Sequence, residues 1–280
     1  MIARALIATL AVFAASTPAT ADAATAAVSG STLTYTAGSG ETNQVSVTLQ
    51  NGAYQITDSQ SGASNGGPVT ISPGAGCVPS GVATVSCPAA GVSRLVVSLG
   101  DGSDSAAIGP PTPATIDGGS GNDVLNGGGA ADTLRGGDGR DTLGGGDGDD
   151  ALDGGAGDDT LDGSGGADRL DGGDGADAVT GGPGDDVLEA DPGADTLHGG
   201  DGTDSADYSA RTEPVSVSPD GEANDGGADE HDNVSSDIEN LVGGSGPDVI
   251  GGGPGRNVID GGPGDDSLDG GAGDDTIGGA

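Results

Sequence analysis

The sequence of 280 residues has no lysine and no tryptophan, and its seven arginines face 45 acidic residues. The resulting formal charge of −38 excludes a basic surface for nucleic acid, and the lack of lysine excludes a phosphate-binding P-loop. Aromatic residues make up only 1% of the chain. With so few large apolar side chains, the acidic region cannot collapse against its own repulsion, so we expect it to fold only when cations neutralise it.

Cysteine and histidine are equally scarce, which limits the available chemistry. His198 and His231 stand far apart, so the H-E-x-x-H pair of a zinc protease is absent. Cys77 and Cys87 are the only cysteines. In an exported chain they are predicted to form one intramolecular disulfide, and closing so short a loop stabilises a fold by about 2–3 kcal/mol.

Long apolar runs are missing as well. The run Leu6–Ala15 is too short to span a bilayer. With Arg4 before it and small residues up to Ala23, it is typical of a secretory signal peptide over residues 1–23; a buried N-terminal helix is the alternative. We therefore expect no integral membrane segment and a secreted, extracellular protein.

What the chain has in abundance is a nine-residue repeat with the template G-G-x-G-x-D-x-U-x, in which U is apolar. Ten consecutive units fill residues 118–207. Twenty-six of their thirty glycine positions hold Gly, the sixth position is always Asp, and the eighth is Leu or Val in nine units. Four more units fill residues 243–278, with Asn257 in place of one aspartate. Biased composition alone would not keep one phase over this length, so the pattern is a true repeat.

One apolar residue in nine cannot form a globular core, but a column of such residues can form a thin one when the units stack. The period therefore predicts a solenoid, with a very short strand around position eight and a turn at the glycines. A turn with free carbonyls and one carboxylate supplies half of the roughly six to eight oxygen ligands that calcium prefers, and the stacked turn supplies the rest. The predicted cofactor is Ca²⁺, bound as multiple ions.

This template resembles the RTX (repeat-in-toxin, haemolysin-type) calcium-binding nonapeptide. The resemblance implies an all-β fold, a right-handed parallel β-roll (β-solenoid) in which two units form one coil and ions lie between successive turns. It makes the sixth-position residues the metal ligands: Asp123, Asp132, Asp141, Asp150, Asp159, Asp168, Asp177, Asp186, Asp195, Asp204, Asp248, Asn257, Asp266 and Asp275. Asn257 keeps one oxygen and loses the charge, so its site is expected to be weaker.

The segments around the repeats have other patterns. Residues 24–107 alternate polar and β-branched residues between turn signals, which predicts a small β unit that contains the disulfide and caps the roll. The first array is predicted over residues 108–207 and the second over residues 243–280, whose last coil is expected to be uncapped.

Residues 208–242 break the period. They are similar to the spacer found between nonapeptide blocks in secreted RTX proteins. Two interpretations stay open, namely wider coils with Asp207 or Glu239 as extra ligands, or a surface loop.

Together these features predict a secreted, non-enzymatic calcium-binding protein that folds into a β-roll on binding calcium. Adjacent carboxylates such as Asp158 and Asp159 could suggest a glycosidase, but they fall at positions five and six of the calcium template. One alternative is a surface adhesion or matrix protein whose stiffened roll presents residues 24–107 to an extracellular or cell-surface partner. An unrecognised hydrolase and a permanently disordered polyanion are the others. Self-association through the uncapped C-terminal coil is a further expectation.

Overall fold

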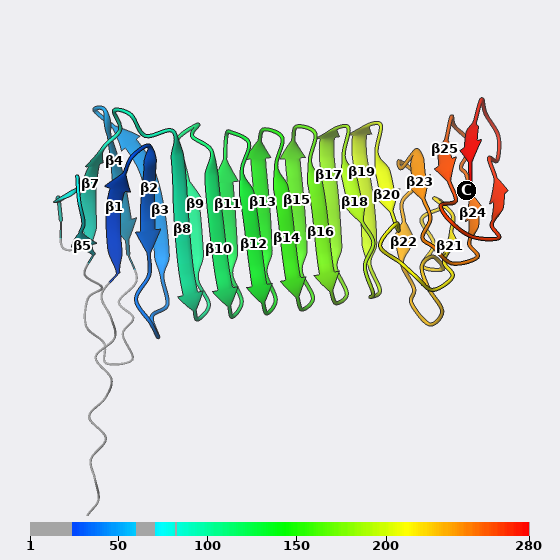
Figure 1. Ribbon diagram of the computed structural model, residues 1–280, viewed down its shortest axis with the longest axis horizontal. Helices are drawn as coiled ribbons and strands as arrows, with labels where there is room; N and C mark the ends of the chain where they lie inside the picture. The colour runs from blue at the N-terminus through cyan, green and yellow to red at the C-terminus, as the bar shows by residue number, and fades with distance from the viewer. Residues whose placement is uncertain (1–23, 60–70, 82, 280) are drawn as a thin grey trace, which may run out of the picture.

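The protein is a stack of β-coils. The computed structural model describes residues 24–59, 71–81 and 83–279, so the expected signal peptide over residues 1–23 lies outside the described residues. Within these ranges the chain forms strands and turns only, and no helix is present that could cross a membrane. The strands stand side by side along one long axis, from the N-terminal strands at one end to the C-terminal strands at the other (Figure 1).

Sheet I is the longest sheet of the described residues, with thirteen strands. In spatial order they are β5 (Ser72–Pro73), β1 (Thr25–Ser29), β2 (Thr32–Thr36), β8 (Arg94–Asp101), β10 (Ala114–Ser120), β12 (Thr133–Asp138), β14 (Ala151–Ala156), β16 (Arg169–Asp174), β18 (Val187–Glu189), β20 (Ser205–Asp207), β23 (Asn240–Val242), β25 (Val258–Asp260) and β27 (Thr276–Gly278). From β2 onward, all neighbours in this sheet are parallel.

Sheets II and III form the other side of the stack. The eleven strands described for sheet II are, in spatial order, β6 (Val78–Pro79), β7 (Thr84–Pro88), β4 (Ala53–Asp58), β3 (Gln44–Gln50), β9 (Ser105–Ile108), β11 (Val124–Gly128), β13 (Thr142–Asp147), β15 (Thr160–Gly165), β17 (Ala178–Gly184), β19 (Thr196–Gly202) and β22 (Asn233–Val234). Sheet III consists of β21 (Ser216–Val217), β24 (Val249–Gly251) and β26 (Ser267–Asp269), all parallel.

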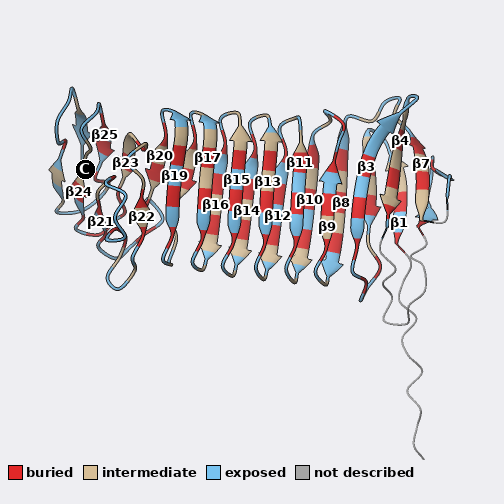
Figure 2. Cartoon of the chain, turned by 180° about the vertical axis from the view of Figure 1, so that it is seen from behind, coloured by how far each residue is buried: buried red, intermediate tan, exposed pale blue. Residues whose placement is uncertain are grey.

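The register gives one coil per two nonapeptides. Successive repeat strands alternate between sheet I and sheet II, and each pairs with the strand that follows by one full coil: Leu134 lies beside Leu152, and Leu125 beside Leu143. The eighth-position side chains of the first array are 0–2% exposed and form one continuous core. Figure 2 shows these buried residues as bands that repeat from strand to strand. The β-roll predicted from the repeat is confirmed.

Most strands of the first array are longer than the three residues expected around position eight, because their pairing continues into the glycine turn. Gly137, for example, pairs with Gly119 on one side and Gly155 on the other. Its φ of 113° disfavours other residues, and a Cβ at this position would collide with the carbonyl oxygen of Gly119. Glycine is therefore required here both by backbone conformation and by the close approach of the next coil.

The N-terminal strands continue both sheets of the roll. Strand β2 pairs in parallel with β8, and β3 pairs in parallel with β9, while β1–β2, β3–β4 and β4–β7 are antiparallel pairs. Buried Leu33, Tyr35 and Val45 belong to the same core as the leucines of the repeats. Cys77 and Cys87 form the predicted disulfide.

The segment over residues 208–242 contributes strands to all three sheets. Strand β22 pairs with β19 of sheet II, and β23 pairs with β20 of sheet I. Strand β21 opens sheet III by pairing with β24. The two repeat arrays are thus joined through paired strands.

Truncation of a single core leucine should destabilise the roll strongly. Leu161 is 1% exposed and lies between Leu143 and Val179, so Leu161→Ala should lower the free energy of unfolding by about 2–5 kcal/mol. Urea unfolding in saturating calcium measures this change. Val124→Ala, at a side chain that is 46% exposed, is the control and should have little effect; equal losses for the two variants would contradict the stacked core.

Candidate metal centre

The sixth-position aspartates lie along two edges of the stack. Turns that lead from sheet I to sheet II form the first edge, and turns that lead from sheet II to sheet I form the second edge. The first edge carries Asp123, Asp141, Asp159, Asp177 and Asp195, and the second carries Asp132, Asp150, Asp168, Asp186 and Asp204. All ten side chains are 0–4% exposed. The first array therefore contains two columns of buried carboxylates.

One oxygen of each carboxylate is held by the neighbouring coil. The backbone N–H of Asp141 donates to Oδ1 of Asp159 at 2.7 Å, and the N–H of Asp159 donates to Oδ1 of Asp177 at 2.7 Å. The second edge repeats this contact, for example from Asp150 to Asp168 at 2.7 Å. Each of these bonds spans 18 residues, so the side chain of one coil satisfies the backbone of the coil before it.

The other oxygen is buried and has no hydrogen-bond donor among the described residues. This holds for Oδ2 of nine of the ten aspartates, namely Asp123, Asp132, Asp141, Asp150, Asp159, Asp168, Asp177, Asp186 and Asp204. A buried polar atom without a partner is costly, and a charged one more so. Two rows of such oxygens require either protons or cations.

Backbone carbonyls converge with these carboxylates at the first glycine of the repeat. A methyl group on Gly154 would lie 2.7 Å from Asp159 Oδ2 and 2.6 Å from the carbonyl oxygen of Gly172 in the next coil. On the second edge, a methyl on Gly127 would lie 2.6 Å from Asp132 Oδ2 and 2.8 Å from the carbonyl oxygen of Gly145. Carboxylate and carbonyl oxygens from two coils thus face one open space, which is the donor set that calcium prefers. The residues present fit calcium.

The raised pKa values of the column aspartates in the metal-free protein also favour a bound cation. Burial raises the pKa of Asp150, Asp159 and Asp168 to about 6, although the backbone N–H bond to each of them lowers it; neighbouring carboxylates raise it further. Burial also raises the pKa of Asp123 and Asp141. At neutral pH the folded roll must therefore hold ionised carboxylates in an unfavourable environment, and a bound cation would relieve this cost.

The adjacent aspartates at position five have a different environment. Asp149 Oδ1 accepts a hydrogen bond from Ala167 N at 3.0 Å, and Asp185 Oδ1 accepts one from Thr203 N at 3.0 Å. Both side chains are exposed. These aspartates connect successive turns on the outside of the stack. The pairs of adjacent aspartates thus have a structural role, with position five on the outside and position six inside.

The second array is less uniform. Asp248 is buried and accepts from Val215 N at 2.9 Å, whereas Asp266 and Asp275 are half-buried. Asn257 is buried, and its Nδ2 donates to the carbonyl oxygen of Glu239 at 3.0 Å, while its Oδ1 has no partner among the described residues. An amide donor thus lies where the other sites have only oxygens.

Two further members of the first-edge column, Asp104 and Asp232, were not predicted as ligands from the sequence. Asp104 is 3% exposed and its N–H donates to Asp123 Oδ1 at 2.8 Å; the signal for it was Gly100, Gly102 and Asp104 at positions two, four and six of an imperfect unit. Asp232 accepts from Asp195 N at 3.0 Å. No repeat surrounds Asp232, so the sequence contains no signal for its place in the column.

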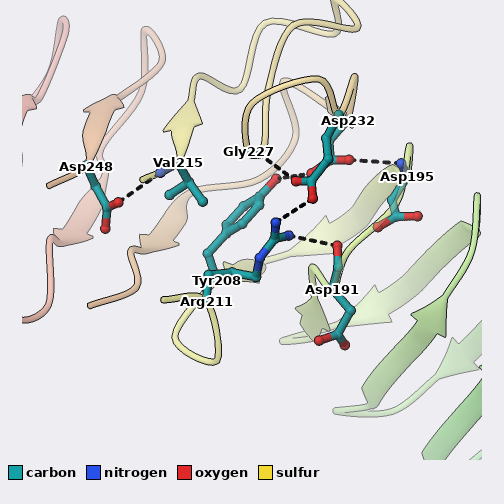
Figure 3. A network of polar contacts seen from close by, with 9 residues as sticks. Asp191, Asp195, Tyr208, Arg211, Val215, Gly227, Asp232 and Asp248 are labelled. Atoms are coloured by element: carbon teal, nitrogen blue, oxygen red, sulfur yellow. Dashed lines mark hydrogen bonds and ion pairs between the residues drawn. The ribbon is translucent and has the colours of Figure 1, made fainter. Parts of the chain in front are cut away.

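At Asp232 the column ends in protein donors, as Figure 3 shows. Its Oδ1 accepts from Asp195 N at 3.0 Å and its Oδ2 accepts from the hydroxyl of Tyr208, a fully buried side chain, at 3.2 Å. Arg211 lies beside them, donates to the carbonyl oxygen of Asp191 at 2.9 Å and pairs with Glu230. Both oxygens of Asp232 are therefore satisfied without a metal.

His198 comes close to a serine and an aspartate but not in a catalytic arrangement. Its Nδ1 lies 3.1 Å from Ser235 Oγ and 3.3 Å from Asp237 Oδ2. A Ser-His-Asp triad needs the two partners on different ring nitrogens. These three side chains therefore do not form one.

Comparison with known families identifies the repeat. The family model described as RTX calcium-binding nonapeptide repeat (4 copies) matches residues 114–143, 144–179, 171–206, 235–265 and 242–277. All fourteen predicted ligands lie within the matched residues. No curated protein matches the chain.

The metal-free roll should be more stable at pH 5 than at pH 7.5. Carboxyls with a folded pKa of about 6, such as those of Asp150, Asp159 and Asp168, bind more protons than the same groups in the unfolded chain, where the ordinary value is near 4. The free energy of unfolding therefore falls as the pH rises from about 4 to about 6. Far-UV circular dichroism of dialysed, metal-free protein measures this effect.

With saturating calcium the direction should reverse, because protons and calcium compete for the same oxygens. The calcium-loaded protein at both pH values is thus the control. An equal response to acid with and without calcium would contradict the assignment of these carboxylates as ligands.

Proposed function

Because this chain belongs to the proteins that contain RTX calcium-binding nonapeptide repeats, we propose that it is a secreted, non-enzymatic calcium-binding protein whose repeats fold into the β-roll when calcium binds. The observation that carries the proposal is the pair of columns in which each buried aspartate has one oxygen held by the preceding coil and the other oxygen, in nine of ten, without a donor in the described part of the chain. A fold that depended on protein contacts alone would not leave a row of buried carboxylate oxygens unsatisfied.

Folding and binding are coupled because one site takes oxygens from two coils. Asp159 contributes its carboxylate from one coil, and Gly172 contributes its carbonyl from the next. Calcium, when bound, supplies the positive charge that offsets the repulsion between the aspartates of a column. In the unfolded chain these oxygens are separated and solvated, so the site exists only after the coils have stacked.

Location outside the cell agrees with this mechanism. Extracellular calcium modules bind the ion at about 10⁻⁴ to 10⁻³ M, so the chain would stay unfolded where calcium is scarce and fold where it is plentiful. The Cys77–Cys87 disulfide is typical of an oxidising compartment, and residues 1–23 have the pattern of a secretory signal. A non-enzymatic role is supported by the structural contacts of the paired carboxylates and by the geometry at His198.

Calcium should induce β structure cooperatively in the full chain, and magnesium should not. Magnesium holds its water more tightly and demands a stricter octahedral geometry than a turn of carbonyls provides. Far-UV circular dichroism during titration with each ion measures the response. No change with calcium, or the same change with magnesium, would overturn the proposed function.

Substitution of a column aspartate should raise the calcium concentration at the midpoint of folding, and the rise should be larger for a more buried aspartate. Asp159→Ala removes a carboxylate that is 2% exposed, together with its bond to Asp141 N. A hydrogen bond to a charged group contributes about 1.5–3 kcal/mol, so the midpoint should rise by about tenfold or more. Asp275→Ala, at a half-buried position of the last described turn, should have a smaller effect.

The matched control is Asp162→Ala, which removes an exposed carboxylate at position nine of the same unit. Asp162→Ala removes one negative charge, as Asp159→Ala does, but residue 162 lies on the outer face of sheet II. The calcium concentration at the folding midpoint should therefore stay close to that of the unmodified protein. Equal midpoints for Asp159→Ala and Asp162→Ala would count against ligation at position six.

A further inference from the structure

The first-edge column of half-satisfied carboxylates begins before the residues that match the family. Asp104 precedes residue 114, where the match starts. Its side chain is 3% exposed, its Oδ1 accepts from Asn43 N at 2.6 Å, and its own N–H donates to Asp123 Oδ1 at 2.8 Å. Its Oδ2 is buried and has no donor among the described residues. Asp104 is thus in the same state as the sixth-position aspartates of the repeats.

Among the described residues, the surroundings of Asp104 are acidic and contain no compensating base. Glu41 is 6% exposed and Asp58 is fully buried, so three of the four acidic residues of segment 24–107 are buried near one another. Arg94 is the only basic residue of that segment. Its Nη2 donates to Thr115 Oγ1 at 2.6 Å on the exposed outer face of sheet I. No side chain of the segment can therefore supply the positive charge.

Carbonyl oxygens from two segments meet at this place. Asn43 Nδ2 donates to the carbonyl oxygens of Glu41 and Leu99, each at 3.4 Å, and to Asp104 Oδ1 at 3.3 Å, so an amide donor lies among these oxygens. A methyl group on Gly102 would lie 2.8 Å from the Glu41 carbonyl oxygen. The end of β8 with the turn up to Asp104, and residues 41–43 before β3, thus bring oxygens of the kind that calcium binds together around the Asn43 amide, where the N-terminal strands meet the roll.

We infer that Asp104 is a ligand of an additional calcium ion at this junction, and that this ion orders the N-terminal strands β1–β7 on the roll. The inference rests on the proposed calcium-dependent folding and adds a site outside the matched repeats. Asp104 links both parts directly, since it accepts from Asn43 just before β3 and donates to Asp123 in the first complete repeat.

The junction site should be weaker than the sites of the repeats. Gly100 pairs with Gly119, which puts Leu99 opposite Gly118, the first glycine of the first unit. The buried Leu99 side chain therefore occupies a position that is glycine in nine of the ten units of the first array. With less open space beside Asp104, the N-terminal strands should order at a higher calcium concentration than the repeats do.

Asp104→Asn in the full chain tests this inference, with Asp101→Asn as the matched control. The two residues are three positions apart, Asp101 at the end of β8 and Asp104 just before β9, but Asp101 is exposed, and an amide oxygen at position 101 can still accept the hydrogen bond from Gly40 N. Equilibrium dialysis gives the calcium bound per chain. Hydrogen exchange of residues 32–58 and of residues 142–179, followed over a calcium titration, gives the order of the N-terminal strands and of the repeats separately.

Asp104→Asn should bind one ion fewer than the Asp101→Asn control, and protection of residues 32–58 should require about tenfold more calcium, while residues 142–179 respond as before. Equal stoichiometry and equal protection in the two variants would overturn the junction site. If residues 32–58 of the Asp104→Asn variant stay unprotected at every calcium concentration, the variant does not fold in this part, and the unmodified protein then tests the site. Protection of those residues that appears after protection of the repeats supports the site, and protection already present without metal overturns it.

The two proposals fail in different ways. If residues 142–179 of the unmodified protein do not respond to calcium at all, the proposed function itself is wrong. If they respond while residues 32–58 are indifferent to calcium, only the junction site is wrong.

Discussion

The hydrogen bond from the backbone of one sixth-position residue to the carboxylate of the next coil is the contact on which the rest of the structure depends. It sets a register of 18 residues and draws each aspartate into the edge of the stack. Because it uses only one oxygen, it also leaves the second oxygen buried and open. The same contact therefore makes the fold regular and leaves open the oxygens that the proposed calcium ions would fill.

The hydrophobic contribution is real but narrow. Each nonapeptide buries one aliphatic side chain, such as Leu152 or Leu161, against the equivalent residue of the coils on either side. In a solenoid, stability is roughly the sum of such nearest-neighbour contacts. Opposing it are buried carboxylates in two columns whose mutual repulsion acts along the same axis. Under the proposed calcium binding, the outcome of folding would therefore depend on the ionic conditions as well as on the apolar core.

The repeats could be predicted from the sequence because their geometry is local. Once two nonapeptides form a coil, any aspartate at position six must lie on an edge and any leucine at position eight must point inward, as Asp159 and Leu161 do. The imperfect unit Gly100–Ala106 is visible in the sequence, but Asp104 was not among the predicted ligands, and Leu99 stands where the template has its first glycine. Asp232 could not be predicted, because its contact with Asp195 spans 37 residues and depends on the path of a segment without a period. Tyr208 begins the segment that resembles the RTX spacer, but its hydroxyl contact with Asp232 depends on the same long-range path.

The alternation of strands between two sheets restricts how such a chain can change in length. Loss or gain of a single nonapeptide within the first array would move every later strand to the opposite sheet and every later carboxylate to the opposite edge. In residues 208–242, β22 pairs with β19 and β23 pairs with β20. After such a change, the strands that these two need as partners would lie in the opposite sheets. Loss or gain of two units removes or adds one complete coil and leaves all of these pairings intact. The roll can therefore gain or lose nonapeptides only in pairs, although the unit that repeats in the sequence is a single nonapeptide.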